Sequence, residues 1–127
     1  MITVDRLMTR HLVTLETGRS ALEAATLMKT RTIGSVFITQ HSRIVGIVTE
    51  SDIIRKVVGA DQAPAALLVE NIMSSPVIGI DSRQLVTDAA DLMERHKIRH
   101  LAVSSAHAIV GVVSVRDLLH PVAIDEL

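Results

Sequence analysis

The stretch Gly46-Ile47-Val48-Thr49-Glu50-Ser51-Asp52 occurs a second time, shifted by 65 positions, as Gly111-Val112-Val113-Ser114-Val115-Arg116-Asp117. In both copies an apolar run ends at a hydroxyl residue, and an aspartate follows three positions later. Thr49 and Asp52 have the spacing of a capping box, with the hydroxyl residue at N-cap and the acid at N3. The pattern therefore predicts a buried strand that leads directly into a helix, twice in the chain.

The repeat extends well beyond this stretch. Residues 4–54 align with residues 69–119 at the same shift and without a gap, and Leu7-Met8-Thr9 falls on Ile72-Met73-Ser74. The methionines at positions 8, 28, 73 and 93 match between the copies, which indicates core residues rather than metal ligands. Two half-size units of this kind gain a core by packing on each other, and a cleft between them is a natural place for a ligand.

Hydrophobic periodicity and turn residues predict the same elements in each copy. In the first copy we expect a strand over 12–15, a helix capped by Ser20, a hairpin with strands 35–39 and 44–49, and a second helix from residue 49. In the second copy we expect strands 77–80, 100–104 and 109–114, a helix over about 85–96, and a last helix from residue 115. The predicted fold class is mixed α/β (α+β), with two β-α-β-β-α motifs over 1–58 and 69–122 and a linker over 59–68.

Composition excludes several classes of function. The 127 residues include no cysteine, 13 basic and 14 acidic residues, and Phe37 as the only aromatic. Near-neutral charge and the lack of stacking side chains argue against nucleic-acid binding. No apolar run approaches the roughly 18 residues of a membrane span, and the charged start does not resemble a signal peptide. We therefore expect a soluble, cytoplasmic protein.

No pattern of catalytic or metal-binding residues is present. The chain has no nucleophile elbow, no phosphate-binding Walker loop and no GxGxxG, and its six histidines lack metal-ligand spacing. We therefore expect neither an enzyme nor a metal site. The strand-helix junctions remain, because backbone N–H groups, a hydroxyl and a carboxylate converge there and a carboxylate commonly holds the two hydroxyls of a ribose. Helix capping alone explains the same residues, and the sequence leaves both interpretations open.

These junctions, together with the two Val-x-x-(Leu/Ile)-Met-(Thr/Ser) openings at Val4 and Val69, resemble a tandem pair of CBS domains, named after cystathionine beta-synthase and also called a Bateman module. The resemblance covers nearly the whole chain. It implies two motifs related by a pseudo-twofold axis and packed through their sheets, with clefts between the repeats that bind adenosine-containing ligands. It also implies a homodimer.

The resemblance assigns roles to individual positions. It places the ribose at Thr49, Asp52, Ser114 and Asp117. It places adenine near Thr9, Val13, Ile33, Ser74, Ile78 and Ile98, and phosphates near Arg99, His100 and Arg116. The first copy has Gly34-Ser35 where the second has Arg99-His100, so two equivalent phosphate sites are not expected.

The resemblance thus implies a regulatory module without an obligatory cofactor. It would sense AMP, ADP or ATP, with S-adenosylmethionine less favoured because Arg99 suits a phosphate. Occupancy would be passed to an unidentified partner protein through the geometry of the dimer. Two alternatives stay open: a dimerisation or scaffold module whose clefts remain empty, and a nucleic-acid-binding protein.

Overall fold

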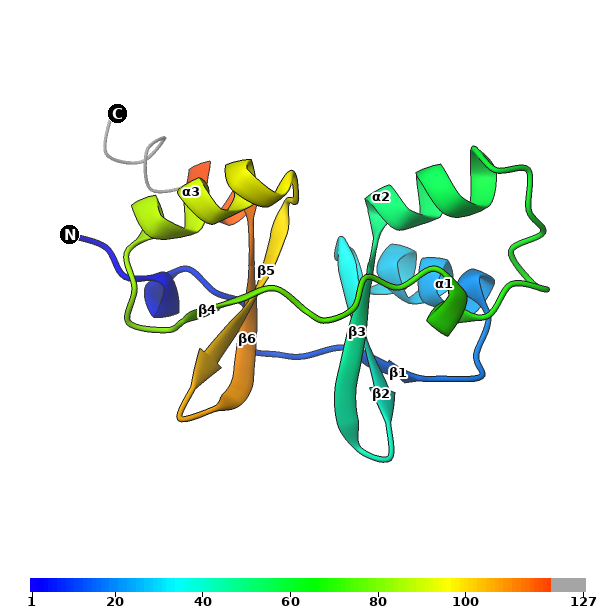
Figure 1. Ribbon diagram of the computed structural model, residues 1–127, viewed down its shortest axis with the longest axis horizontal. Helices are drawn as coiled ribbons and strands as arrows, with labels where there is room; N and C mark the ends of the chain where they lie inside the picture. The colour runs from blue at the N-terminus through cyan, green and yellow to red at the C-terminus, as the bar shows by residue number, and fades with distance from the viewer. Residues whose placement is uncertain (120–127) are drawn as a thin grey trace. The chain divides into compact units, whose positions relative to one another are not determined.

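The chain forms two compact units, and the computed structural model describes residues 1–119 of it (Figure 1). The first unit is Val13–Val77. The second unit joins Met1–Leu12 to the chain from Ile78 onward. Each unit contains one three-stranded sheet and its own hydrophobic core.

In the first unit the elements follow the predicted β-α-β-β-α order. They are β1 (Thr14–Glu16), α1 (Ala21–Arg31), β2 (Ser35–Gln40), β3 (Arg43–Thr49) and α2 (Glu50–Asp52), which continues as a π-helix, η2 (Ile53–Val58). Residues 59–66 form turns, and a single 3-10 turn, η3 (Val69–Asn71), follows them. Strand β1 pairs in parallel with β2, and β2 pairs antiparallel with β3.

The second unit has the same order. It contains a 3-10 turn, η1 (Val4–Arg6), and then β4 (Gly79–Asp81), α3 (Val86–His96), β5 (His100–Ser105) and β6 (Ala108–Ser114). Residues 115–119 are helical up to the end of the described chain. The sheet order is β4-β5-β6 with the same parallel and antiparallel pairings. The predicted mixed fold with two β-α-β-β-α motifs is confirmed.

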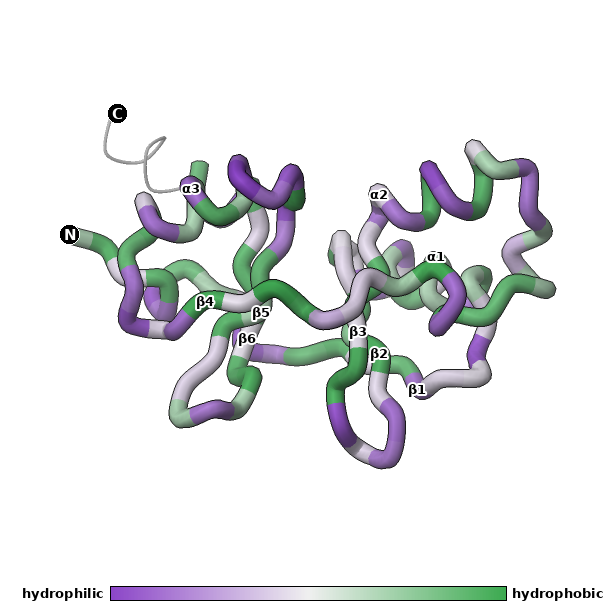
Figure 2. Tube along the Cα trace, viewed as in Figure 1, coloured by the Kyte–Doolittle hydropathy of each residue, from purple (hydrophilic) through white to green (hydrophobic). Residues whose placement is uncertain are grey.

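Local sequence explains where these elements begin and turn. The Ser20 hydroxyl accepts the N–H of Glu23 at 3.2 Å, so Ser20 caps α1 as predicted. The β2–β3 hairpin turns at His41 and Ser42, and both residues have positive φ. Two-residue hairpin loops need this conformation because its twist matches that of the two strands. Apolar residues concentrate along the strands, and polar residues mark the hairpin turns (Figure 2).

The segment containing each Leu/Ile-Met pair belongs to the core of the other copy. Val69 and Ile72 are buried in the core of the first unit, where Met73 packs beside them. Val4 is buried in the core of the second unit, with Met8 beside it. The predicted core role of the methionines is confirmed, since Met28 and Met93 are also buried.

The two compact units therefore divide the chain differently from the repeat boundaries over 1–58, 59–68 and 69–122 that the sequence suggests. Residues 120–122 of the second motif lie outside the described residues. Because the N-terminal segment of each copy crosses to the other copy's core, neither repeat is a self-contained folding unit.

Glycines in β3 and β6 lie where the segments that contain Met8 and Met73, called the crossing segments below, pass against the strands of the other copy. A Cβ on Gly46 would lie 2.8 Å from Met73 Cγ, and a Cβ on Gly111 would lie 2.8 Å from the Thr9 carbonyl oxygen. A side chain at either position would force its neighbour to shift, a methionine side chain at Gly46 and also backbone at Gly111, so glycine suits the strand where the other copy's segment passes.

Candidate functional site

The junction between β3 and α2 is closed by reciprocal hydrogen bonds. The N–H of Thr49 donates to Asp52 Oδ2 at 2.9 Å, and the N–H of Asp52 donates to the Thr49 hydroxyl oxygen at 3.3 Å. The Thr49 hydroxyl also lies 3.2 Å from Asp52 Oδ2. This is the predicted capping box, and Asp52 is buried within it at 7% exposure.

The junction after β6 repeats this geometry. The N–H and hydroxyl of Ser114 lie 2.8 and 3.1 Å from Asp117 Oδ2, and the N–H of Asp117 donates to the Ser114 hydroxyl oxygen at 3.3 Å. Each distance is within 0.1 Å of its counterpart in the first copy. The capping role is therefore confirmed in both copies.

The two aspartates differ at their second carboxylate oxygen. Asp52 Oδ1 forms an ion pair with Lys56 Nζ at 2.9 Å, and the same ammonium donates to the Ile72 carbonyl oxygen at 2.8 Å. Within residues 1–119, Asp117 Oδ1 has no hydrogen-bond or ion-pair partner. Sequence reasoning missed Lys56, although its spacing of four from Asp52 in a predicted helix could have indicated the pair.

Basic residues lie at the same end of the second unit's sheet as Asp117. The N–H of Val115 donates to the Arg99 carbonyl oxygen at 2.9 Å, and His100 is the cross-strand partner of Ser114. Arg99 and Arg116 are both exposed. The structure thus brings the residues predicted for phosphate and for ribose in the second copy to one sheet end.

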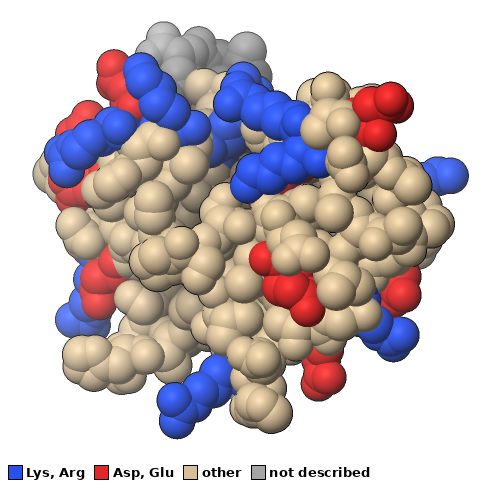
Figure 3. Space-filling model, turned by 45° about the vertical axis from the view of Figure 1, so that its right-hand side comes forward, with Lys and Arg blue, Asp and Glu red and all other residues tan. Residues whose placement is uncertain are grey.

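The corresponding end of the first unit carries different charges. The N–H of Glu50 donates to the Gly34 carbonyl oxygen at 3.0 Å, and Ser35 is paired with Thr49. Glu50 and Ser51 occupy the positions of Val115 and Arg116. The first copy therefore has no arginine at these positions and one additional acid. Acidic and basic side chains both occur on the molecular face in Figure 3.

The four aliphatic residues predicted near adenine lie against the cores. Val13 and Ile33 are half-buried beside the core of the first unit, and Ile78 and Ile98 beside that of the second. The Val13 carbonyl accepts the N–H of Phe37 at 2.9 Å, which places Val13 at the start of the β1–β2 pairing. Each pair thus borders the sheet of its own unit.

Thr9 and Ser74 are exchanged between the copies by the crossing segments. Thr9 exchanges two backbone hydrogen bonds with Val112 on β6, and Ser74 exchanges two with Ile47 on β3. Thr9 is therefore in the unit that contains Asp117, and Ser74 in the unit that contains Asp52. Sequence reasoning missed this exchange, and the repeated strand glycines were its signal.

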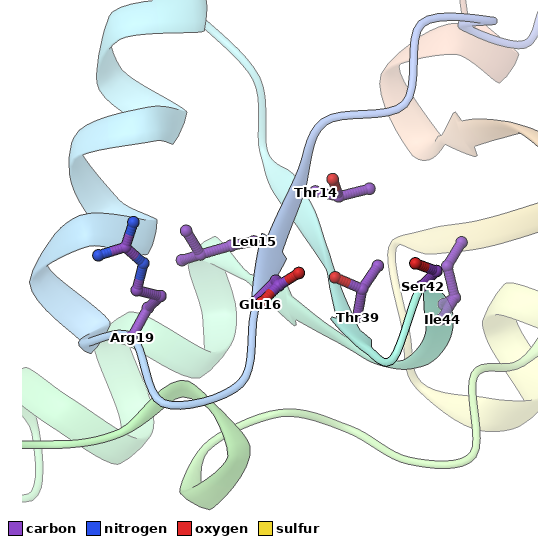
Figure 4. A pocket seen from close by; sticks show the side chains of 7 residues that line it. All are labelled: Thr14, Leu15, Glu16, Arg19, Thr39, Ser42 and Ile44. Carbon is purple, nitrogen blue, oxygen red and sulfur yellow. The ribbon is translucent and has the colours of Figure 1, made fainter.

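A surface pocket of about 600 Å³ lies elsewhere in the first unit (Figure 4). Residues of β1, the segment after it and the β2–β3 hairpin line it: Thr14, Leu15, Glu16, Arg19, Thr39, Ser42 and Ile44. Thr39 and Ile44 are near the hairpin turn, at the opposite end of the sheet from Thr49. None of the predicted site residues lines this pocket.

Among residues 1–119, no group of three or more His, Asp or Glu side chains is placed to hold a metal ion. Over the same residues, no helix has the length and apolar character needed to cross a membrane.

Comparison with known proteins gives a consistent family. The family model for the CBS domain matches the chain twice, over residues 4–59 and 69–123. The chain is 32% identical over 120 residues to an uncharacterised protein from Methanopyrus kandleri, covering 93% of this chain and 61% of that protein. The chain thus spans less than two thirds of that relative's length.

Solved structures share the fold over nearly the whole chain. A CBS-domain protein from Burkholderia ambifaria superposes with a TM-score of 0.93 at 30% identity, covering 99% of this chain and 97% of that one. The CBS domain pair of protein MJ0100, solved in complex with 5′-methylthioadenosine and S-adenosyl-L-methionine, has a TM-score of 0.85 at 23% identity over 98% of both chains. Neither the family model nor these proteins indicates an enzymatic activity.

Proposed function

The chain belongs to the CBS domain family, whose domain pairs are regulatory modules, and on this premise we propose that it senses an adenine nucleotide or related adenosyl compound. Occupancy is passed to a partner protein through a change in the geometry of a homodimer. The observation that carries the proposal is the second carboxylate oxygen of Asp117, which has no hydrogen-bond or ion-pair partner within residues 1–119. It belongs to the sheet end that also carries the Ser114 hydroxyl and the exposed Arg99 and Arg116.

The second copy supplies the chemistry for each part of a nucleotide. The carboxylate of Asp117 accepts the ribose hydroxyls through Oδ1 while Oδ2 continues to cap the helix. The guanidinium groups of Arg99 and Arg116 suit a phosphate because they donate paired hydrogen bonds and carry a permanent charge. Ile78 and Ile98 offer aliphatic surface to adenine. A purine in this chain must pack on aliphatic groups, because Phe37 is its only aromatic.

Adenosyl compounds are the favoured ligand class because a structure of the same fold, the MJ0100 domain pair, holds two of them. The charge of the site favours one class of substituent on the 5′ carbon of the adenosine. Arg99 and Arg116 favour AMP, ADP or ATP over the cationic sulfonium of S-adenosylmethionine. No obligatory cofactor is involved, since the nucleotide acts as a regulatory ligand.

Signalling follows from differential affinity. A ligand shifts the equilibrium between two conformations only by as much as it binds one more tightly than the other. Homodimerisation is supported by apolar side chains on η2, where Ile54 and Val58 are 63% and 69% exposed and lie four residues apart on one helix face.

A ligand-free scaffold is the second candidate, and the first copy favours it. In that copy Lys56 already forms an ion pair with Asp52, and Gly34 stands at the position of Arg99. The first copy therefore has neither an unpaired carboxylate oxygen for a ribose nor this arginine for a phosphate. If the second copy also stays empty, the exposed apolar residues on η2 would be the functional surface.

Calorimetric titration with AMP separates the two candidates. We expect the wild-type protein to bind AMP and Asp117→Ala to lose binding, while its free energy of unfolding falls by only about 0.5–2 kcal/mol. Asp88→Ala is the matched control, because Asp88 caps α3 in the same unit by accepting the N–H of Leu85 at 3.1 Å. It should lose similar stability and keep its affinity. Undiminished AMP binding by Asp117→Ala contradicts the ribose role, and no binding of AMP, ADP, ATP or S-adenosylmethionine to the wild type favours the scaffold.

A further inference from the structure

We infer that the two copies are not equivalent as ligand sites, because Lys56 commits Asp52 to a structural contact and leaves Asp117 as the residue that receives the nucleoside. This inference rests on the proposed function, and it names which of the two copies binds the nucleoside. It also assigns Lys56 a role as the counter-ion of Asp52, which prevents a ribose from binding to the first copy.

Both carboxylate oxygens of Asp52 already have partners. Oδ2 accepts the N–H and the hydroxyl of Thr49, and Oδ1 lies 2.9 Å from Lys56 Nζ. The Asp52 side chain is 9% exposed, whereas that of Lys56 is 44% exposed. A hydrogen bond from an ammonium to a carboxylate is stronger than one from a neutral hydroxyl, so a ribose hydroxyl does not replace Lys56 without loss.

Displacing Lys56 would also break a second contact. Its ammonium donates to the Ile72 carbonyl oxygen at 2.8 Å, and Ile72 is buried at 1% exposure in the core of the first unit. Lys56 thereby ties α2 and η2 to the segment that crosses from the second copy. A ligand that took Asp52 Oδ1 would leave this carbonyl without its charged donor, which adds to the cost of opening the site.

The second copy has no equivalent of this lysine. The position that corresponds to Lys56 is Pro121, whose ring carries no cation. The hydrogen bonds that Asp117 accepts within residues 1–119 both go to Oδ2, and Oδ1 accepts none there. Asp117 is also half-buried where Asp52 is buried, so Asp117 is the more exposed of the two residues.

The charges around each junction act in the same direction. Glu50 stands beside Asp52, while Val115 takes its place beside Asp117. The additional acid makes the first junction less favourable for an anionic ligand than the second, where Arg99 and Arg116 attract it. Geometry and charge agree on the same half of the molecule.

The test is the number of adenosine molecules bound per chain, measured by equilibrium dialysis. Adenosine is the probe because it lacks a phosphate, so the count reports the ribose sites without the arginines. We expect one equivalent for the wild type, one for Asp52→Asn and none for Asp117→Asn. Lys56→Met should raise the count from one to two, because Asp52 Oδ1 is then free.

Arg55→Met is the matched control for Lys56→Met. It removes the same charge from the neighbouring position of η2, where the exposed Arg55 forms no ion pair within residues 1–119, and should leave the count at one. Thermal unfolding of each variant checks that it is folded. Because Lys56→Met leaves the capping box untouched, it tests the inference even if Asp52→Asn does not fold.

The outcomes separate this inference from the proposed function. Two equivalents in the wild type, reduced to one by Asp52→Asn, would overturn the inference and leave the proposed function standing. A count of one in Lys56→Met would show that Lys56 is not what closes the first site and would also overturn it. No binding of adenosine or AMP by the wild type would overturn the proposed function itself, and the inference with it.

Discussion

The first and second units contain the same capping box, and they differ one helical turn later. The backbone and hydroxyl contacts to Asp52 and Asp117 agree within 0.1 Å, yet within residues 1–119 an ammonium pairs with Asp52 and none with Asp117. Similar geometry at a motif thus shows that both residues begin a helix, which is a structural role. The residue four positions further is Lys56 in one copy and Pro121 in the other, and we propose that this difference decides which copy binds a ligand.

The largest effect should come from the crossing segments, whose burial differs between the copies. Ile72 is 1% exposed in the core of the first unit, whereas its counterpart Leu7 is half-buried in the second. Ile72→Ala should lower the free energy of unfolding by about 2–5 kcal/mol, because it leaves a cavity in a core. Leu7→Ala should cost clearly less. Denaturant unfolding measures both, and equal losses would contradict the difference in burial.

A smaller effect is expected at the strand glycines, and it should be larger at Gly111, where a Cβ would lie 2.8 Å from the Thr9 carbonyl oxygen, than at Gly46, where only the Met73 side chain is closer than 3.0 Å. Gly46→Ala and Gly111→Ala should each lower the free energy of unfolding by about 1–3 kcal/mol, because the added methyl group overlaps the crossing segment. The double variant Gly46→Ala with Met73→Ala should cost less than the sum of the single changes, since the smaller side chain removes part of the overlap. Additive losses would mean that Gly46 matters for another reason.

The helix caps offer a third comparison. Ser20 caps α1 with its hydroxyl, whereas the N-cap residue of α3 is Leu85, which has no acceptor in its side chain. Ser20→Ala should lower the free energy of unfolding by about 0.5–2 kcal/mol, since the N–H of Glu23 loses its partner. Leu85→Ala removes no capping contact and serves as the control for the matched position. Thermal unfolding of the two variants tests whether α1 depends on its N-cap side chain, since the cap of α3 is supplied by Asp88 and not by Leu85.

The smallest effect on stability should be the loss of the ion pair between Lys56 and Asp52 in Lys56→Met. The lysine is 44% exposed, so solvent screens the pair, and we expect it to contribute only about 0.2–1 kcal/mol to the free energy of unfolding. The lost hydrogen bond to the Ile72 carbonyl oxygen adds to this cost. The loss should shrink as salt is added, because a partly exposed pair is screened by ions. A loss of several kcal/mol would mean that Lys56 holds the core together and is not chiefly a counter-ion for Asp52.

Much of the fold could be predicted from residues close together in the chain. The hairpins, the start of α1 at Ser20 and the two capping boxes each depend on contacts within a few residues, and the structure contains all of them. The strands β1 and β4 begin two residues later than predicted, at Thr14 and Gly79. Short strands carry too few residues for a periodic pattern to define their ends.

Candidate site residues could be chosen from the sequence, but their grouping could not. The repeat alone places Thr9 with Asp52 and Ser74 with Asp117, whereas hydrogen bonds to Val112 and Ile47 place them the other way round. The exchange depends on contacts between residues more than 25 positions apart, such as Ser75 with Val45. Nothing within one repeat records which of two similar cores its own N-terminal segment will cover.

By itself, the sequence determined the repeat, the order of the elements and the capping boxes, because these follow from periodicity and from side chains that reach only neighbouring backbone. Only the tertiary structure decided that the segments around Met8 and Met73 exchange cores and that Lys56 reaches both Asp52 and Ile72. The physical reason is that side-chain burial and charge pairing are properties of the packed chain. Two copies with the same local pattern therefore differ in which side chains pair with them in the folded chain. Within residues 1–119, Asp52 has an ion-pair partner and Asp117 has none.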